Sequence, residues 1–377
     1  MDRIQTIDFM RGIIMIIMAI DHASFFVAKI RFSEFWGIDL SSNNETVWFF
    51  TRLISHICAP GFFFLMGVGV LFLVQSRLKS GWSNFRIKRF LITRGLILII
   101  IEMILVAPAW IMGDAFSAIE IDKAKLPGIE GPIFGNFGIL SSLGASMILS
   151  SFLIQVDKKW LLLLSIAGII GSYLYVNSLP VHFDQARYFG SILLIPGNWS
   201  PISVNYSILP WLFICLLGVV WGKYFKENPD KIFQQTFLMG LAMVLLFIIL
   251  RFLHFGNFQM DQFDGIISFL TIIKYPASIA FMLLTLWVFF MLLSAFSKLR
   301  IPSVINTPVI VFGRTALFFY IIHLYIYFLI GLLFPNGASY ITMCISWLGG
   351  LVVLYFLCKK YYEFKLKKDI NSIWRFF

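Results

Sequence analysis

The chain has 377 residues, of which 59% are apolar and 13% are charged, and its formal net charge is +11. Soluble domains carry about 25% charged residues, so the composition excludes a soluble multidomain protein. The high hydrophobicity also excludes a disordered chain, and what remains is the class of polytopic membrane proteins.

Ten apolar runs approach or exceed the length of about 20 residues that a helix needs to cross the hydrocarbon core. They are Phe9–Ile30, Phe49–Gln75, Leu91–Ile111, Phe134–Ile154, Trp160–Val176, Ser203–Phe225, Phe233–His254, Tyr275–Phe296, Val304–Phe334 and Ala338–Leu357. We therefore predict an all-α polytopic protein with about ten transmembrane helices, folded as a single integral membrane domain over residues 1–377. The ninth run is long enough to contain an interfacial segment before its span.

The first run is expected to stay in the mature protein. No small-residue cleavage site follows it, and it carries Asp21 and His22, so it does not resemble a signal peptide. The four cysteines lie in or beside apolar runs, and no structural disulfide is expected.

Basic residues set the orientation of a membrane protein because they collect on the cytoplasmic side. Most of the 30 Lys and Arg residues fall on one side when both termini are placed in the cytoplasm. The charge of +11 thus reflects topology, and we expect no nucleic-acid partner. The Ile-, Phe- and Lys-rich composition favours a bacterial inner membrane, and the sequence leaves a homodimer open.

Two longer outer segments, at about 112–133 and 177–202, stand out among the loops. The second is rich in Pro, Gly, Asn and aromatic residues and contains His182. They are either ordinary extracellular loops or a lid over an outward-facing site.

Ionisable residues inside the spans form the list of functional candidates, because each costs several kcal/mol unless it is paired or hydrated. The set comprises Arg11, Asp21, His22, Arg52, His56, Arg94, Glu102, Arg314 and His323. No Cys/His spacing typical of a zinc site occurs, and we expect no metal.

The first helix places Arg11, Met15, Met18 and His22 on one stripe, with Arg11 and His22 about 16 Å apart along the axis. Arg11 would lie near the cytoplasmic rim and His22 in the outer half. This geometry suits a substrate with an anionic cytoplasmic end and a reactive end deep in the membrane. The simpler interpretation is that Arg11 reaches the lipid headgroups and His22 makes one structural hydrogen bond.

Neighbouring residues on a helix point about 100° apart, so Asp21 is expected to reach another helix, with Arg52 or Lys274 as its partner. If a different carboxylate or carbonyl orients His22, it would raise the basicity of the imidazole and fix its tautomer. Arg52 and His56 share one face of the second helix, which puts His56 and His22 at a similar depth. The alternative is a hydrogen-bonded packing cluster.

Three further features complete the candidate set. Pro60 and Gly61 are expected to kink the second helix beside the site. Glu102 must be protonated, paired or functional. Arg314 and His323 are nine residues apart, which on one regular helix puts them on opposite faces.

Several stretches resemble a known family. The opening RIQTIDFMRGIIMIIMAIDH is similar to the first helix of the heparan-alpha-glucosaminide N-acetyltransferase-like membrane proteins, bacterial branch. Further similar stretches follow in the expected order: FFTRLISHICAPGFFFLMG, RGLILIIIE, YSILPWLFICLLGVVWG, KYPASIAFMLLTL and FGRTALFFYIIHLYI. The spacing from Arg11 to His22 also resembles the R-x10-H pattern of the wider transmembrane acyltransferase-3 group.

The resemblance implies a membrane acyltransferase in which acetyl-CoA or another acyl-CoA donates and a sugar or glycan amine or hydroxyl accepts. Lysosomal members are expected to carry a catalytic His in the first luminal loop, but the corresponding loop here, Arg31 to Trp48, contains none. The acyltransferase-3 spacing moves the role to His22, with His56 as the second candidate.

The chemistry expected from this resemblance assigns a role to each residue. A neutral imidazole would take the acceptor proton, Arg52 or His56 would stabilise the oxyanion, and Arg11 and Arg94 would bind the CoA phosphates. An acyl-histidine intermediate and direct transfer are both left open. The competing hypotheses are a proton-coupled transporter or flippase using the same His, Glu and Arg residues, and a scaffold without chemistry.

Overall fold

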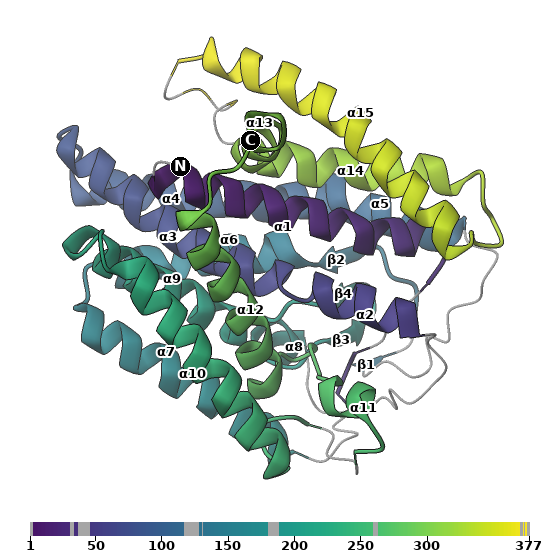
Figure 1. Cartoon of the computed structure of the whole chain (residues 1–377), viewed down its shortest axis with the longest axis horizontal. Coiled ribbons are helices and arrows are strands. Elements are labelled where there is room, and N and C mark those ends of the chain that lie inside the picture. Colours follow the sequence, from purple (N-terminus) through teal and green to yellow (C-terminus); the bar gives the residue numbers. More distant parts are fainter. Residues whose placement is uncertain are drawn as a thin grey trace.

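The computed structural model describes residues 3–30, 34–36, 46–116, 128–129, 131–179, 188–258, 263–369, 372 and 374. These residues are mainly helical, and the long helices pack side by side in one bundle (Figure 1). The helices are α1 (Arg3–Phe26), α2 (Thr46–Ser55), α3 (Cys58–Lys79), α4 (Asn84–Ile101), the π-helical turn η1 (Glu102–Val106), α5 (Ala107–Ala115), α6 (Ile139–Leu153), α7 (Lys158–Asn177), α8 (Tyr188–Leu193), α9 (Ile208–Glu227), α10 (Ile232–Phe252), α11 (Ile266–Leu270), α12 (Ile279–Lys298), α13 (Ser303–Arg314), α14 (Ala316–Gly331) and α15 (Tyr340–Leu366).

Eight helical segments within the described ranges are long and apolar enough to span a membrane, or nine if one bent pair is counted as a span. A multi-pass membrane protein is thus confirmed, whereas the count of ten is not. The fourth predicted run begins with a short strand, and its only helix is α6, whose 15 residues extend about 22 Å at 1.5 Å per residue. This is shorter than the hydrocarbon core of about 30 Å.

The ninth predicted run is not one straight helix, because α13 and α14 meet at an angle of 94°. The backbone leaves the helical region at Thr315, and α13 is short and ends at Arg314, as expected of a segment that precedes the span. The prediction that Arg314 and His323 lie on opposite faces of one helix is therefore wrong. The two residues belong to different helices. Their spacing in the sequence therefore does not determine the relative directions of their side chains.

The second span is interrupted between α2 and α3, at His56 and Ile57. Pro60 explains the position, because a proline ring clashes with the carbonyl four residues earlier and provides no amide hydrogen for it. The interruption thus falls one turn before the expected kink. Pro108 acts similarly in the third span, where α4 passes through η1 before α5 begins.

A four-stranded sheet lies at one end of the bundle, so the prediction of a purely α-helical fold needs correction. Strands β3 and β4 form an antiparallel hairpin, and β1 and β2 add parallel strands on either side. The strands are β1 (Gly128–Ile129), β2 (Gly135–Phe137), β3 (Gly197–Trp199) and β4 (Ile202–Val204). They come from the two outer segments and the residues that follow them, whose short paired stretches carry no clear alternating pattern.

The start of α1 and the end of α15 lie on the same side of the bundle, away from the sheet (Figure 1). The Nε of Arg314 donates to Asp8 of α1 over 3.0 Å, and its Nη1 donates to the hydroxyl of Tyr362 in α15 over 2.8 Å. The first helix therefore begins, and the last long helix ends, on the same side of the bundle. The cytoplasmic location of that side stays a prediction.

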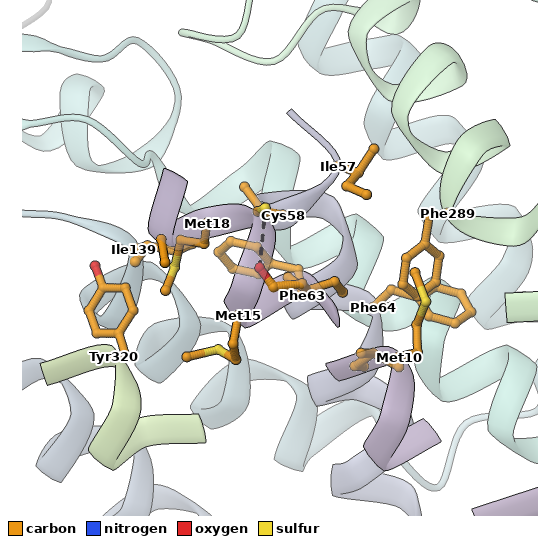
Figure 2. Packing of buried hydrophobic residues seen from close by; sticks show 14 of the residues in the cluster. Met10, Met15, Met18, Ile57, Cys58, Phe63, Phe64, Ile139, Phe289 and Tyr320 are labelled. Atoms are coloured by element: carbon orange, nitrogen blue, oxygen red, sulfur yellow. Dashed lines mark hydrogen bonds between the residues drawn. The ribbon is translucent and has the colours of Figure 1, made fainter. Parts of the chain in front are cut away.

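Close helix packing supports the core of the bundle. A Cβ at Gly67 of α3 would lie 1.9 Å from the carbonyl oxygen of Cys215 in α9, so only glycine allows this approach. Aromatic and Met side chains fill the adjoining space, including Met10, Phe63, Phe64 and Phe289 (Figure 2).

Candidate active site

A cavity of about 280 Å³ opens beside the second half of α1 and extends to the small sheet. We call it the histidine cavity. Its acidic, basic and histidine lining residues among the described positions are Asp21, His22, Arg52, Glu102, Asp114 and Lys274. Four of these come from the predicted candidate set, and Lys274 is the alternative partner that the sequence suggested for Asp21.

His22 is oriented by a second histidine from α14. Its Nδ1 lies 2.6 Å from Nε2 of His323, and Nδ1 of His323 lies 2.9 Å from the carbonyl oxygen of Phe319. Because a carbonyl only accepts, Nδ1 of neutral His323 carries the hydrogen and its Nε2 accepts from Nδ1 of His22. The Nε2 of His22 is then the unprotonated nitrogen, and Trp110 packs edge-on against the ring at 5.0 Å.

This arrangement supplies the orienting partner expected for His22, although its chemistry differs from the prediction. The sequence suggested a carboxylate or a carbonyl, whereas the structure uses an imidazole that is itself held by a carbonyl. An imidazole brings no negative charge, so it fixes the tautomer of His22 without adding the electrostatic effect of a carboxylate.

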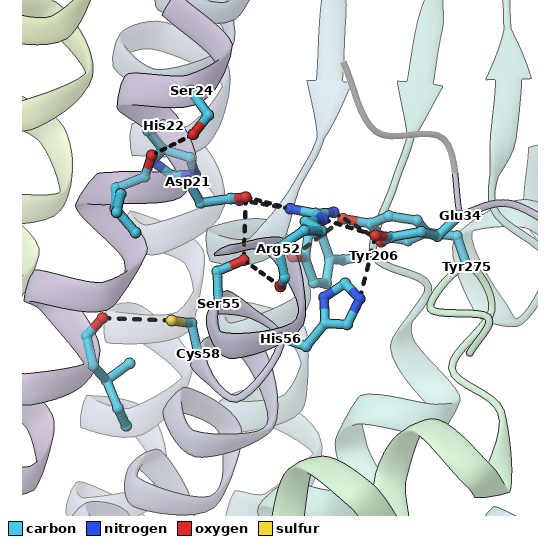
Figure 3. A network of polar contacts seen from close by, with 12 residues as sticks. Asp21, His22, Ser24, Glu34, Arg52, Ser55, His56, Cys58, Tyr206 and Tyr275 are labelled. Carbon is cyan, nitrogen blue, oxygen red and sulfur yellow. Dashed lines mark hydrogen bonds and ion pairs between the residues drawn. The ribbon is translucent and has the colours of Figure 1, made fainter. Parts of the chain in front are cut away.

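Asp21 and Arg52 form the ion pair expected from the sequence. Nη1 of Arg52 lies 2.7 and 2.6 Å from the two carboxylate oxygens of Asp21, and the Ser55 hydroxyl donates to Asp21 over 3.1 Å. The other side of the guanidinium donates to Glu34 from Nε and Nη2, each over 2.8 Å. Figure 3 shows Arg52 lying between the two carboxylates.

Glu34 also contacts the second candidate histidine. Its Oε1 lies 3.2 Å from Nε2 of His56. Burial alone would raise the pKa of Glu34, but the charge of Arg52, together with His56 and the hydrogen bonds from both side chains, holds it well below its usual value. Glu34 is therefore an anion, and it makes Arg52 and His56 parts of one buried network.

This network changes the roles available to its members. The nitrogens of Arg52 are directed at carboxylates, which does not favour the oxyanion role that the sequence suggested. His56 faces Glu34 and Phe281 and is not among the residues that line the histidine cavity. The structure thus places His22 in the cavity and His56 behind Arg52.

Glu102 lies at the start of the π-helical turn and is fully buried. Its Oε2 accepts a hydrogen bond from the Leu140 amide at the start of α6, over 2.8 Å, while Oε1 has no hydrogen-bond partner among the described residues. A Cβ at Gly138 would lie 2.3 Å from that Oε1. Glu102 therefore caps α6 with one oxygen and presents a second one beside the cavity.

A second cavity, of about 320 Å³, lies toward the end of the bundle where α1 starts. We call it the basic cavity. Its lining residues within the described ranges include no carboxylate, and its cations are Arg11, Arg94, Arg314 and Lys365. The two arginines predicted to bind phosphates thus meet, and Arg314 and Lys365 join them from distant parts of the chain.

Asp8 holds two of these cations in place. Its Oδ1 accepts from Arg11 over 3.1 Å and its Oδ2 accepts from Arg314 over 3.0 Å. One carboxylate lies between two guanidinium groups, so the cavity keeps an excess of positive charge. The i,i+3 spacing of Asp8 and Arg11 is a sequence signal that could have identified this residue.

The two cavities adjoin at Phe62, Ile139 and Tyr320, which line both of them. Met15 lines the basic cavity and Met18 the histidine cavity, so the predicted stripe from Arg11 to His22 runs along both. Figure 2 shows Met18, Ile139 and Tyr320 gathered at this junction.

Several predictions concern residues beyond the described part of the chain. His182 lies outside it, as do residues 117–127, 130 and 180–187 of the two outer segments, although Ile133 does line the histidine cavity. Whether these segments form a lid stays open. Among the residues that are described, no group of three or more His, Cys, Asp or Glu side chains could hold a metal ion.

The model of the family described as heparan-alpha-glucosaminide N-acetyltransferase, catalytic, matches residues 3–251, about two thirds of the chain. No curated protein matches the sequence. The matched range contains His22, Arg52 and Glu102, and it ends before Lys274, Arg314 and His323.

Proposed function

The chain belongs to the heparan-alpha-glucosaminide N-acetyltransferase catalytic family, and on that premise we propose that it moves an acetyl group from cytoplasmic acetyl-CoA to a sugar. The family and the apolar helices make it a membrane acetyltransferase. The further parts of the proposal are the donor site, the acceptor and the role of His22. The observation that carries them is the pair of adjoining cavities, one basic and one holding an oriented neutral histidine.

The basic cavity is the proposed donor site. The 3′-phosphate and diphosphate groups of acetyl-CoA, or of another acyl-CoA, suit the cluster formed by Arg11, Arg94, Arg314 and Lys365. The distribution of Lys and Arg supports a cytoplasmic location for this end of the bundle, where acyl-CoA is made. The pantetheine arm would pass Tyr320 and Phe62, and its thioester would reach the histidine cavity.

His22 is the proposed general base. Its Nε2 takes the proton from the amine or hydroxyl of the acceptor as that atom attacks the thioester carbonyl carbon. The carbon–sulfur bond then breaks, and the protonated His22 returns the proton to the departing CoA thiolate. Acetyl-acceptor and free CoA are the products, and no metal ion takes part in the proposed mechanism.

The acceptor is proposed to be a sugar or glycan amine or hydroxyl that enters from the outer side. Aromatic side chains in the histidine cavity, among them Trp110, Tyr206 and Tyr275, provide flat faces for a sugar ring. Asn136, Ser203 and Asn205 add polar groups from the sheet side. The proposed location is the inner membrane of a bacterium.

The test uses purified protein with labelled acetyl-CoA and glucosamine. Labelled acetylglucosamine should form with the wild type and fall by about 10² to 10⁴-fold with His22→Ala. Thermal unfolding of both proteins checks that the variant is folded. Transfer that is unchanged by His22→Ala would remove this residue from the mechanism.

A second arm addresses the transporter hypothesis. The same protein is reconstituted in sealed liposomes, and sugar uptake is measured with and without a pH gradient. Uptake driven by the gradient, with no transfer from any acyl-CoA, would replace the proposed function by transport.

A further inference from the structure

Lys274 is a buried cation that the proposed mechanism does not use. Its side chain is 5% exposed and lines the histidine cavity, in the segment just before α12. Its ammonium group makes no hydrogen bond and no ion pair with any residue that the structure describes. A buried ammonium without an acceptor is costly, so an anion bound in the cavity would stabilise it.

The chain holds Lys274 in position through its backbone. The amide of Lys274 donates to the Glu34 carbonyl over 3.3 Å, and a parallel bridge joins Phe35 to Tyr275. The side chain therefore extends from a fixed strand-like segment that is tied to the loop carrying Glu34. Its placement at the cavity is part of the fold.

The sequence proposed Lys274 as a possible partner of Asp21, but the carboxylate oxygens of Asp21 bond to Arg52 and Ser55. Asp21 and Glu34 together carry one negative charge more than Arg52. Lys274 is the nearby cation that offsets this excess at longer range. Its hydrogen-bond donors are still directed at the cavity.

The neighbours of Lys274 are aromatic. Its Nζ lies 5.5 Å from the ring centre of Tyr206 and 5.0 Å from that of Tyr275. Burial, together with the neighbouring Tyr275, raises the pKa of Tyr206 well above its usual value, so Tyr206 is a neutral phenol and gives Lys274 no counter-ion. Phe35 stacks on Tyr275 with ring centres 4.8 Å apart and extends the aromatic wall.

We propose that Lys274 binds an anionic substituent, a phosphate, sulfate or carboxylate, of the sugar that enters the histidine cavity. The ring of that sugar would lie against Tyr206 and Tyr275, which is the arrangement that an aromatic wall beside a cation offers. The specificity of the cavity is thus for an anionic sugar over a neutral one. Naming the sugar as the acceptor rests on the proposed function, whereas the binding of an anion does not.

The test measures binding without acetyl-CoA. Calorimetry compares glucosamine 6-phosphate, glucosamine 6-sulfate and glucosamine on purified wild type, Lys274→Met and Lys29→Met. Lys29 is the matched control, since it is also 5% exposed but its ammonium donates to the Phe26 carbonyl over 2.8 Å and it does not line the cavity. Thermal unfolding confirms that each variant is folded.

The wild type should bind both anionic sugars about tenfold or more tightly than glucosamine, as expected for a hydrogen bond to a charged group. Lys274→Met should remove this preference, while Lys274→Arg and Lys29→Met should keep it. Equal binding of all three sugars by the wild type, no binding of any of them, or a preference that survives in Lys274→Met would each overturn the proposal. Binding of inorganic phosphate as tight as that of glucosamine 6-phosphate would also overturn the proposal, because the sugar ring would then contribute nothing to the affinity.

Transfer kinetics separate this proposal from the proposed function. With Lys274→Met, KM should rise for the anionic acceptor and kcat for glucosamine should stay unchanged. An equal fall in kcat for both acceptors would assign Lys274 to the oxyanion and contradict the subsite. Anion-selective binding without any acetyl transfer would leave the subsite in place and remove the acetyltransferase function.

Discussion

The Nδ1 atom of His22 and the Nε2 atom of His323 lie 2.6 Å apart, although the two residues are 301 positions apart in the sequence. The carbonyl of Phe319 fixes the tautomer of His323, and His323 in turn fixes that of His22. A base that must present one unprotonated nitrogen to a substrate is thereby prepared before the substrate arrives.

His323 is therefore expected to act as a positioning residue. His323→Phe keeps an aromatic ring but removes the acceptor for His22, so kcat should fall by about 10²-fold with little change in the KM for acetyl-CoA. His323→Gln offers a carbonyl oxygen to the same N–H group and should restore part of the activity. If Gln and Phe variants lose activity equally while both stay folded, His323 serves only to fill space.

The basic cavity predicts an effect that depends on the phosphates of the donor. Arg11→Gln should raise the KM for acetyl-CoA about tenfold, since a hydrogen bond to a charged group is removed, and leave the KM for S-acetylpantetheine unchanged. Arg300→Gln, an exposed arginine outside the cavity, is the control and should change neither value. A similar rise in KM for both donors would contradict phosphate binding at Arg11.

Glu34 predicts a dependence of stability on pH. Its folded pKa is held well below the usual value by Arg52 and His56, against the opposite effect of burial, so its contribution is complete above the unfolded pKa of about 4.3. That contribution is lost as pH falls through the folded pKa. Glu34→Gln should destabilise the protein near neutral pH by about 3–5 kcal/mol, because it leaves a buried cation without one of its partners.

The measurement is thermal unfolding of wild type and Glu34→Gln in one detergent between pH 7 and pH 3. The difference between the two proteins should be constant at the upper end and shrink below about pH 4.3. A difference that grows with acidification would show that Glu34 is not an anion in the folded protein.

The backbone at Gly138 lies so close to Glu102 that we expect no side chain larger than hydrogen to fit there. Gly138→Ala would bring a Cβ to 2.3 Å from Oε1 of Glu102 and 2.8 Å from Nδ2 of Asn136, both on the cavity wall. Activity should fall and unfolding should occur at a lower temperature, since no atom can remain at those distances.

The matched control for that substitution is Gly171→Ala. A Cβ there meets nothing within 4 Å, and alanine favours the helix by up to about 1 kcal/mol. This variant should be as active as the wild type and no less stable. If Gly138→Ala and Gly171→Ala had the same activity and the same unfolding temperature, the cavity wall at Glu102 would have to shift without cost, which would contradict the prediction.

The sequence alone determined the class of the protein and most of its elements. Runs of about 20 apolar residues must become helices in a bilayer, because every backbone polar group there needs an internal partner. The same reasoning identified the buried ionisable residues, and helix geometry and charge left Arg52 or Lys274 as the partner of Asp21, of which the structure has Arg52. The family followed from short ordered motifs, which the match over residues 3–251 confirms.

Only the tertiary structure decided how these residues combine. A helical period fixes which side of its own helix a residue faces, but it carries no information on the neighbour across the interface. The break at Thr315 puts Arg314 and His323 on different helices. Arg314 therefore bonds to Asp8, and His323 contacts His22. Glu34, in a loop without any period, turned a predicted oxyanion donor into the centre of a buried network and left Lys274 as the cation facing the cavity.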